Sequence, residues 1–178
     1  MANAYRAMGN SPQAESWFRS AIALYEKTHS RFYLAVATMD MGNLYLQQGQ
    51  PEQAETLYRQ ARDVMEQMRN TRGLAQVFNN LGMACTQQHE WGLAEDFLQR
   101  SIALWHKLGE PVSQANAEDN LADAYLQQEK WQPARQILAA ALDHLTGSKV
   151  VGRVASLLSD INAHLRTAEA ALGEAAPS

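Results

Sequence analysis

The sequence repeats itself every 40 residues, and this period constrains the fold more than any other feature. In each copy an alanine is followed four positions later by a large residue. The alanines are Ala14, Ala54, Ala94 and Ala134, and the large residues are Phe18, Tyr58, Leu98 and Leu138. A register kept without gaps indicates stacked copies of one supersecondary unit, each burying its apolar face against the next.

Further positions keep the same register. One column holds the large residues Trp17, Leu57, Phe97 and Ile137, and another holds Tyr5, Tyr45, Cys85 and Tyr125. A third holds the small residues Gly42, Gly82 and Ala122. Small residues let two helices approach closely, and the large residues of the neighbouring columns fill the space around that contact.

Each unit is predicted to form two helices, because its apolar residues recur at three- and four-residue spacing. Abundant Ala, Gln and Glu favour helix and β-branched residues are few, so the expected class is all-α. First helices are expected over residues 32–48, 71–88 and 111–128, and second helices end near Met68, Leu108 and Leu145. Pro12 and Pro51 suit the first position of a second helix, where no N–H is needed.

These columns resemble the tetratricopeptide repeat pattern W-x₂-L-G-x₂-Y followed by A-x₃-F. The copy over residues 71–110 reads Phe78-x₂-Leu81-Gly82-x₂-Cys85 and then Ala94-x₃-Leu98. The resemblance covers about residues 1 to 165. It implies a right-handed superhelical α-solenoid of antiparallel helix hairpins.

The unit departs from the usual 34-residue repeat, because it has 40 residues and no terminal proline. Such long units resemble those of kinesin light chains, spindle-orientation adaptors and bacterial maltose-regulator-type transcription factors. In those families the repeats bind peptides, partner proteins or small effectors. The resemblance therefore implies a non-enzymatic scaffold that binds a protein or peptide. The alternatives are a self-association module and the effector-sensing segment of a larger bacterial regulator.

The expected organisation is a single solenoid over residues 1–166, followed by a frayed Ala-rich tail over residues 167–178. Within the solenoid we expect a partial repeat at 1–30, full repeats at 31–70, 71–110 and 111–150, and a capping helix at 151–166. Met1 falls partway into a first helix. This incomplete edge predicts either a longer array or homo-oligomer formation through Met1, Ala4, Tyr5 and Met8.

In the family the first helices line the inner wall of the solenoid, and the register predicts which residues face it. The predicted peptide-binding residues are Met39, Asp40, Asn43, Gln76, Asn79, Asn80, Met83, Asn116, Asp119, Asn120 and Asp123. Asn side chains both donate and accept, so a ladder of them suits a peptide backbone. The carboxylates favour a neutral or basic segment over an acidic one. The other reading is an ordinary exposed polar helix face.

Composition argues against several other functions. The net charge of −4 and the lack of a Lys/Arg cluster argue against nucleic acid as a partner. No stretch approaches the apolar length of a membrane span, and no signal peptide precedes the repeats, so a cytoplasmic location is expected. The five histidines fall in different repeat columns without ligand spacing, which predicts no metal site. No phosphate loop or catalytic motif occurs, so neither a cofactor nor catalysis is expected.

The aromatic residues are expected in the core rather than at a ligand. Trp105 shares a column with Tyr25, Met65 and Leu145, as inter-repeat packing requires. Trp91 and Trp131 share the column that begins the second helix.

Overall fold

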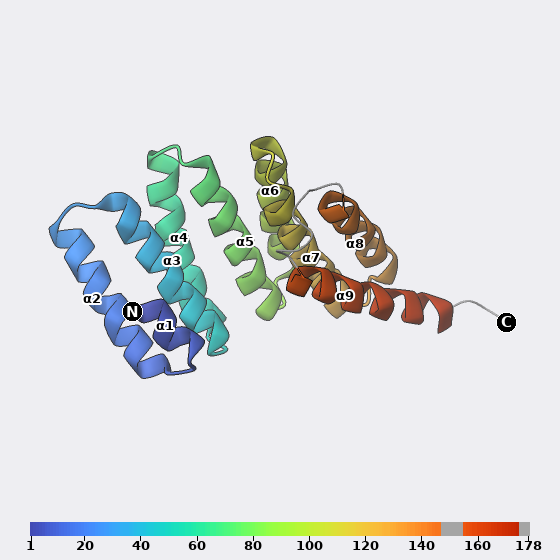
Figure 1. Ribbon diagram of the computed structural model, residues 1–178, viewed down its shortest axis with the longest axis horizontal. Coiled ribbons are helices and arrows are strands. Elements are labelled where there is room, and N and C mark those ends of the chain that lie inside the picture. Colours follow the sequence, from blue (N-terminus) through green and yellow to red (C-terminus); the bar gives the residue numbers. More distant parts are fainter. Residues whose placement is uncertain (147–154, 175–178) are drawn as a thin grey trace. The chain divides into compact units, whose positions relative to one another are not determined.

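The computed structural model describes residues 1–146 and 155–174, and every regular element in those ranges is an α-helix (Figure 1). The predicted all-α class is therefore confirmed. The helices are α1 (Ala2–Ala7), α2 (Ser11–Lys27), α3 (Arg31–Gln47), α4 (Pro51–Gln67), α5 (Thr71–Gln87), α6 (Trp91–Leu108), α7 (Pro111–Gln127), α8 (Trp131–Thr146) and α9 (Ala155–Glu174). None of these helices is both long and apolar enough to cross a membrane.

The turns between the helices repeat as strictly as the helices do. Each turn contains one residue with a left-handed backbone conformation (positive φ), and these residues recur every 20 positions. They are Gly9, His29, Gly49, Arg69, His89, Gly109 and Glu129. The next N–H donates to the carbonyl five residues earlier, as in Gln50 to Tyr45 and Glu90 to Cys85, both at 2.9 Å. This is the Schellman ending of a helix. Each 40-residue unit is therefore built from two equal helix-and-turn halves.

The chain forms two compact units, residues 1–90 and residues 91–178. In the first unit, α2 packs against α1 and α3, and α4 packs against α3 and α5. The tight turns fold each successive pair into an antiparallel hairpin (Figure 1). Ala14, Phe18, Met41 and Leu44 form the core beneath α1, with Tyr5 half-buried against them.

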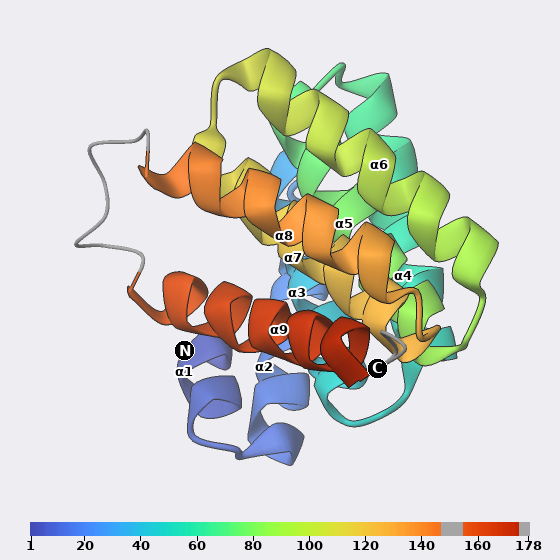
Figure 2. The same ribbon diagram turned by 90° about the vertical axis from the view of Figure 1, so that its right-hand side faces the viewer.

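In the second unit, α7 packs against α6, α8 and α9, and α9 also lies along α8 (Figure 2). Its core joins Ala115 and Ala122 of α7 to Leu138 and Leu145 of α8 and to Ile161 of α9. The four aligned alanines of the repeat, Ala14, Ala54, Ala94 and Ala134, are completely buried in their units. The small residues at this column therefore lie inside the helix packing, as the sequence predicted.

The observed helix bounds lie close to the predicted ones except near the C-terminal end. The first helices begin at residues 31, 71 and 111, and each ends one residue before its expected end. The prediction of a frayed tail after Arg166 was wrong for residues 167–174, which continue α9. Ala168 is completely buried, so this part of the helix has a packing partner. Residues 147–154, which include the start of the predicted cap, and residues 175–178 lie outside the described ranges.

The aromatic residues were expected in the core, but only some of them are buried. Trp105, Met65 and Leu145 are buried. Trp91 and Trp131 are half-buried, as is Tyr25, while Trp17 is 45% exposed. The expectation that the large residues of the Trp17 column fill the space around the helix contact was therefore wrong for Trp17, although Phe97 in the same column is buried.

Candidate functional site

The predicted wall residues of the first unit lie on α3 and α5, and they differ in exposure. We call Met39, Asp40, Asn43, Gln76, Asn79, Asn80 and Met83 the first-helix face of the first unit. Gln76 is exposed and Met39 is buried, whereas the other five are half-buried. Met39 is thus a core residue, and any ligand of this face would be bound mainly by its polar members.

Asn43 and Asn80 are joined across neighbouring repeats. The Nδ2 group of Asn80 donates to Oδ1 of Asn43 at 2.9 Å, and the hydroxyl of Tyr58 donates to the same oxygen at 2.8 Å. Tyr58 is completely buried, so it holds the Asn43 amide from inside the core. Part of the predicted amide ladder therefore connects α3 to α5.

Asp40 is joined to the preceding repeat in the same manner. The Nδ2 group of Asn3 on α1 donates to Oδ2 of Asp40 at 3.0 Å. Both links, Asn3 to Asp40 and Asn43 to Asn80, span 37 residues of sequence, so they are equivalent steps of one repeat-to-repeat pattern. Within the described residues Asp40 makes no ion pair, and its second oxygen accepts no hydrogen bond from another residue.

The first-helix face of the second unit consists of Asn116, Asp119, Asn120 and Asp123 on α7. Asn116 is exposed, and Asn120 and Asp123 are half-buried. Asp119 is buried, which contradicts its expected place on an open wall. Its Oδ1 lies 2.8 Å from Nδ1 of His164 on α9, so the cap helix covers it.

Burial dominates the acid–base behaviour of Asp119. It raises the pKa of the Asp119 carboxyl, against the hydrogen bond to His164, which lowers it. The nearby carboxylates of Asp160 and Asp123 raise the pKa further. Asp119 is therefore part of the α7–α9 packing, and the exposed Asn116 is the better probe of this face.

A second buried carboxylate lies one residue away and was missed by the sequence analysis. Glu118 is 2% exposed, and its carboxylate accepts from Nε2 of Gln114 at 2.9 Å and contacts Nδ1 of His144 at 2.9 Å. The equivalent positions, Thr38 and Phe78, carry no charge. A charged residue at a position that is apolar or neutral in the other copies was the signal available in the sequence.

A repeated glutamate–tyrosine contact links successive repeats on the other side of the first helices. The hydroxyl of Tyr45 donates to Glu15 at 3.0 Å, and that of Tyr125 donates to Glu95 at 2.7 Å. Each glutamate also accepts from the residue four positions later, Arg19 or Gln99. The hydrogen bonds from Arg19 and Tyr45 lower the pKa of Glu15.

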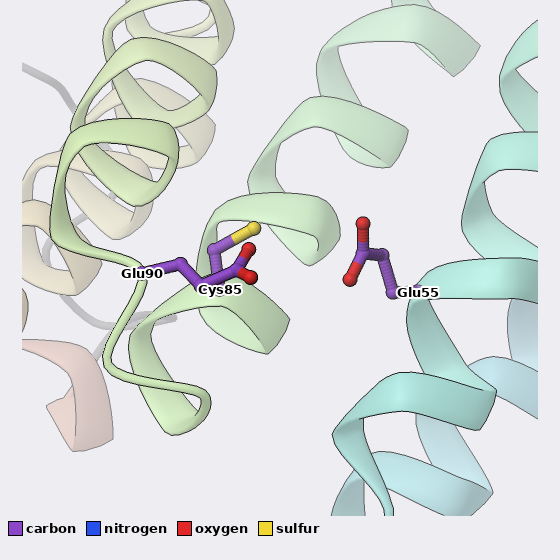
Figure 3. Close-up of side chains that lie close together, drawn as sticks. All are labelled: Glu55, Cys85 and Glu90. Carbon is purple, nitrogen blue, oxygen red and sulfur yellow. The ribbon is translucent and has the colours of Figure 1, made fainter.

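Cys85 replaces the tyrosine in the middle copy of this contact. Figure 3 shows the Glu55 carboxylate turned toward Cys85, with Glu90 beside it. The ligand atoms of these three residues lie within 4.8 Å of one another. Burial favours the neutral form of Glu55, but hydrogen bonds from Gln88 and Arg59 outweigh it and lower the pKa of that carboxyl. Glu55 is therefore already paired, by Gln88 at 2.8 Å and by Arg59.

The Cys85 thiol is expected to react slowly in the folded protein. Burial raises its pKa to about 12, with smaller contributions from the negative charges of Glu55 and Glu90, and the residue is 0% exposed. Thiolate is the reactive form, so modification by a disulfide reagent at pH 8 should be more than tenfold slower in the native than in the urea-unfolded chain. Equal rates would contradict the buried position.

Each unit also contains a groove between its second helices. In the second unit a hollow of about 500 Å³ lies over α7, between Ile102 of α6 and Ile137 of α8. In the first unit Ile22 and Leu57 line a hollow of about 160 Å³ at the equivalent register. Because both grooves occur at the same register of the repeat, the larger groove of the second unit does not by itself indicate an effector site.

Repeated antiparallel helix hairpins joined by equivalent turns define a helical-repeat protein. The tetratricopeptide repeat family model matches residues 1–67 and 73–146, and the chain belongs to that family. Members of the family typically act as protein-interaction scaffolds. No curated protein matches the sequence.

Solved structures share the fold at low sequence identity. The chain is 18% identical to BtubC (BKLC) from P. vanneervenii, with a TM-score of 0.77 over 97% of this chain and 74% of that one. It is 19% identical to nearly identical TPR-like repeats assigned to a kinesin light chain of Podosopora anserina, with a TM-score of 0.77 over 98% and 84%. MamA is 17% identical, with a TM-score of 0.61 over 98% and 95%. These similarities confirm the tetratricopeptide fold.

Proposed function

We propose that the chain is a non-enzymatic scaffold that binds an extended segment of a partner protein on its first-helix faces. The observation that carries this proposal is the Asn43–Asn80 pair. The bond between the two amides and the buried Tyr58 hydroxyl hold both side chains in fixed orientations. Fixing a binding group in advance lowers the entropy lost on association.

This pair keeps one donor and one acceptor for a ligand. Within the described residues, the Nδ2 group of Asn43 and the Oδ1 atom of Asn80 bind no partner, and both residues are half-buried rather than covered. A peptide group presents the complementary C=O and N–H, so the pair suits a main chain irrespective of its side chains.

The charge on these faces favours a neutral or basic segment. Asp40 contributes a carboxylate without an ion pair in the first unit, and Asp123 contributes a half-buried carboxylate in the second. Like charges brought together on binding are unfavourable, so an acidic segment is disfavoured. The expected cytoplasmic location stays a prediction.

The two faces are tested separately, because one segment need not contact both units. A random-peptide display selection is made on the wild-type chain and repeated with Gln76→Arg in the first unit or Asn116→Arg in the second. Both residues are exposed, so the added charge should leave the helical content unchanged. A segment that uses a face should bind at least about tenfold more weakly to the variant on that face.

The matched controls add the same charge to second helices. Gln53 on α4 and Gln132 on α8 are exposed, and Gln53→Arg and Gln132→Arg should leave binding unchanged. Equal binding to all four variants would place any partner elsewhere and would contradict the proposal. Substitution of Asp119 is unsuitable as a test, because that buried residue holds α9.

Self-association through the N-terminal edge is a second candidate. Met1 and Met8 are 82% and 70% exposed, and contact with another chain would bury them. Sedimentation equilibrium tests this directly. A monomer at the highest soluble concentration would exclude it, whereas a dimer that Met8→Glu dissociates would support it.

A further inference from the structure

The first unit contains a hollow with aromatic walls and one carboxylate. It has a volume of about 310 Å³ and lies between α1, α2 and α3. Trp17 and Tyr25 of α2 and Tyr33 of α3 provide the aromatic surface, and Asp40 provides a carboxylate. No other Asp, Glu, Lys or Arg side chain is among the described residues that line it.

The aromatic residues form an arranged surface and are accessible. The rings of Tyr25 and Tyr33 stack, with centroids 5.6 Å apart and planes inclined by 28°. Tyr33 is 58% exposed and Trp17 is 45% exposed, which is unusual for residues of this size in a packed repeat. In the later repeats Met65, Trp105 and Leu145 occupy the Tyr25 column and are buried.

Asp40 is prepared to meet a positive charge. Asn3 holds one carboxylate oxygen at 3.0 Å, which orients the group, and within the described part of the chain no cation pairs with it. The negative faces of aromatic rings and a carboxylate attract the same kind of ligand, an organic cation. An acidic or neutral side chain would gain only the apolar contact.

We infer that this hollow is a binding site for the lysine or arginine side chain of a partner segment. The inference rests on the proposed function, because the cation arrives on the segment that the first-helix face binds. Asp40 belongs to both: it is a member of that face and lines the hollow. The hollow adds side-chain selectivity to a face that otherwise recognises main chain.

A direct test uses the side chain alone as the probe. N-acetyl-arginine methylamide is titrated into ¹⁵N-labelled protein, and the indole N–H signal of Trp17, assigned with Trp17→Phe, is followed by NMR. We expect a saturable shift with a dissociation constant in the millimolar range. N-acetyl-norleucine methylamide and N-acetyl-glutamate methylamide should bind about five- to tenfold more weakly, because neither carries the cation.

Variants separate the carboxylate from the aromatic wall. Asp40→Asn should weaken binding of the arginine probe about three- to fivefold and leave norleucine binding unchanged. Tyr33→Leu should weaken the arginine probe more than the norleucine probe. Glu52→Gln on α4 removes the same charge from an exposed residue outside the hollow and should change neither.

The outcomes distinguish this site from the proposed function. If displayed segments bind through Gln76 but the arginine probe binds no better than norleucine, the scaffold stands and the cation site is wrong. If the probe binds as expected but no segment is selected, the cation site stands and the scaffold is in doubt. If the chain sediments as a dimer and the probe leaves Trp17 unshifted, a second copy fills the hollow and the inference fails.

Discussion

Replacing Gly42 by alanine is expected to destabilise the first unit by about 1–3 kcal/mol, although alanine favours helix over glycine. A Cβ at residue 42 would lie 2.6 Å from Cε1 of Tyr58. The tyrosine ring cannot easily move away, since it is completely buried and its hydroxyl is bonded to Asn43. Urea unfolding followed by circular dichroism at 222 nm measures the effect.

The other repeats supply the compensating change. The third copy has Ala122 where the first full copy has Gly42, and it has Leu138 where that copy has Tyr58. Gly42→Ala combined with Tyr58→Leu should therefore cost less than the sum of the single changes, by about 1 kcal/mol or more. Additive effects would contradict the direct contact.

Gly92 provides the control for helix propensity. It lies in α6, and a Cβ there would meet no atom within 4 Å. Gly92→Ala should be neutral or stabilising by up to about 1 kcal/mol. A loss of stability as large as that of Gly42→Ala would show that the effect does not come from the Tyr58 contact.

Replacing His144 by alanine is expected to lower the free energy of unfolding by about 2–4 kcal/mol at neutral pH. The change leaves the Glu118 carboxylate, which is 2% exposed, with Gln114 as its remaining partner. A buried carboxylate that loses one of its two partners is less well compensated for its burial than one that keeps both. Urea unfolding monitored by tryptophan fluorescence measures the loss.

Two further variants make this result specific. His106 is exposed, so His106→Ala should change the free energy of unfolding by less than about 0.5 kcal/mol. Replacing both members, with Glu118→Leu and His144→Leu, should restore most of the stability, since apolar groups need no partner. If the double variant is less stable than His144→Ala alone, the Glu118–His144 pair stabilises the fold more than apolar side chains do, which would contradict this expectation.

The repeat register predicted much of the fold because interactions between residues close in sequence determine its helices and turns. The aligned alanines are buried, and the turns recur every 20 residues with the same backbone bonds. Helix propensity, apolar spacing and turn residues all act within a few positions of the chain. Such short-range effects are visible in one sequence without knowledge of its partners.

The candidate site was less predictable, because equal register does not mean equal surroundings. Met39, Asn79 and Asp119 share one column, yet Asn79 is half-buried while the other two are buried. Asp119 is covered because His164, 45 residues later, reaches it from α9. The helical period gives the direction of a side chain, but only the neighbouring helix decides what it meets.

The sequence by itself therefore determined the all-α class and the 40-residue helix pairs, whereas the binding faces remain a prediction. The tertiary structure alone decided that Asn43 and Asn80 bond to each other and that Trp17, Tyr25 and Tyr33 surround a hollow with Asp40. Repeat spacing follows from bonded geometry along one chain. Pairing and exposure depend on side chains from different helices, whose contacts exist only after the helices pack.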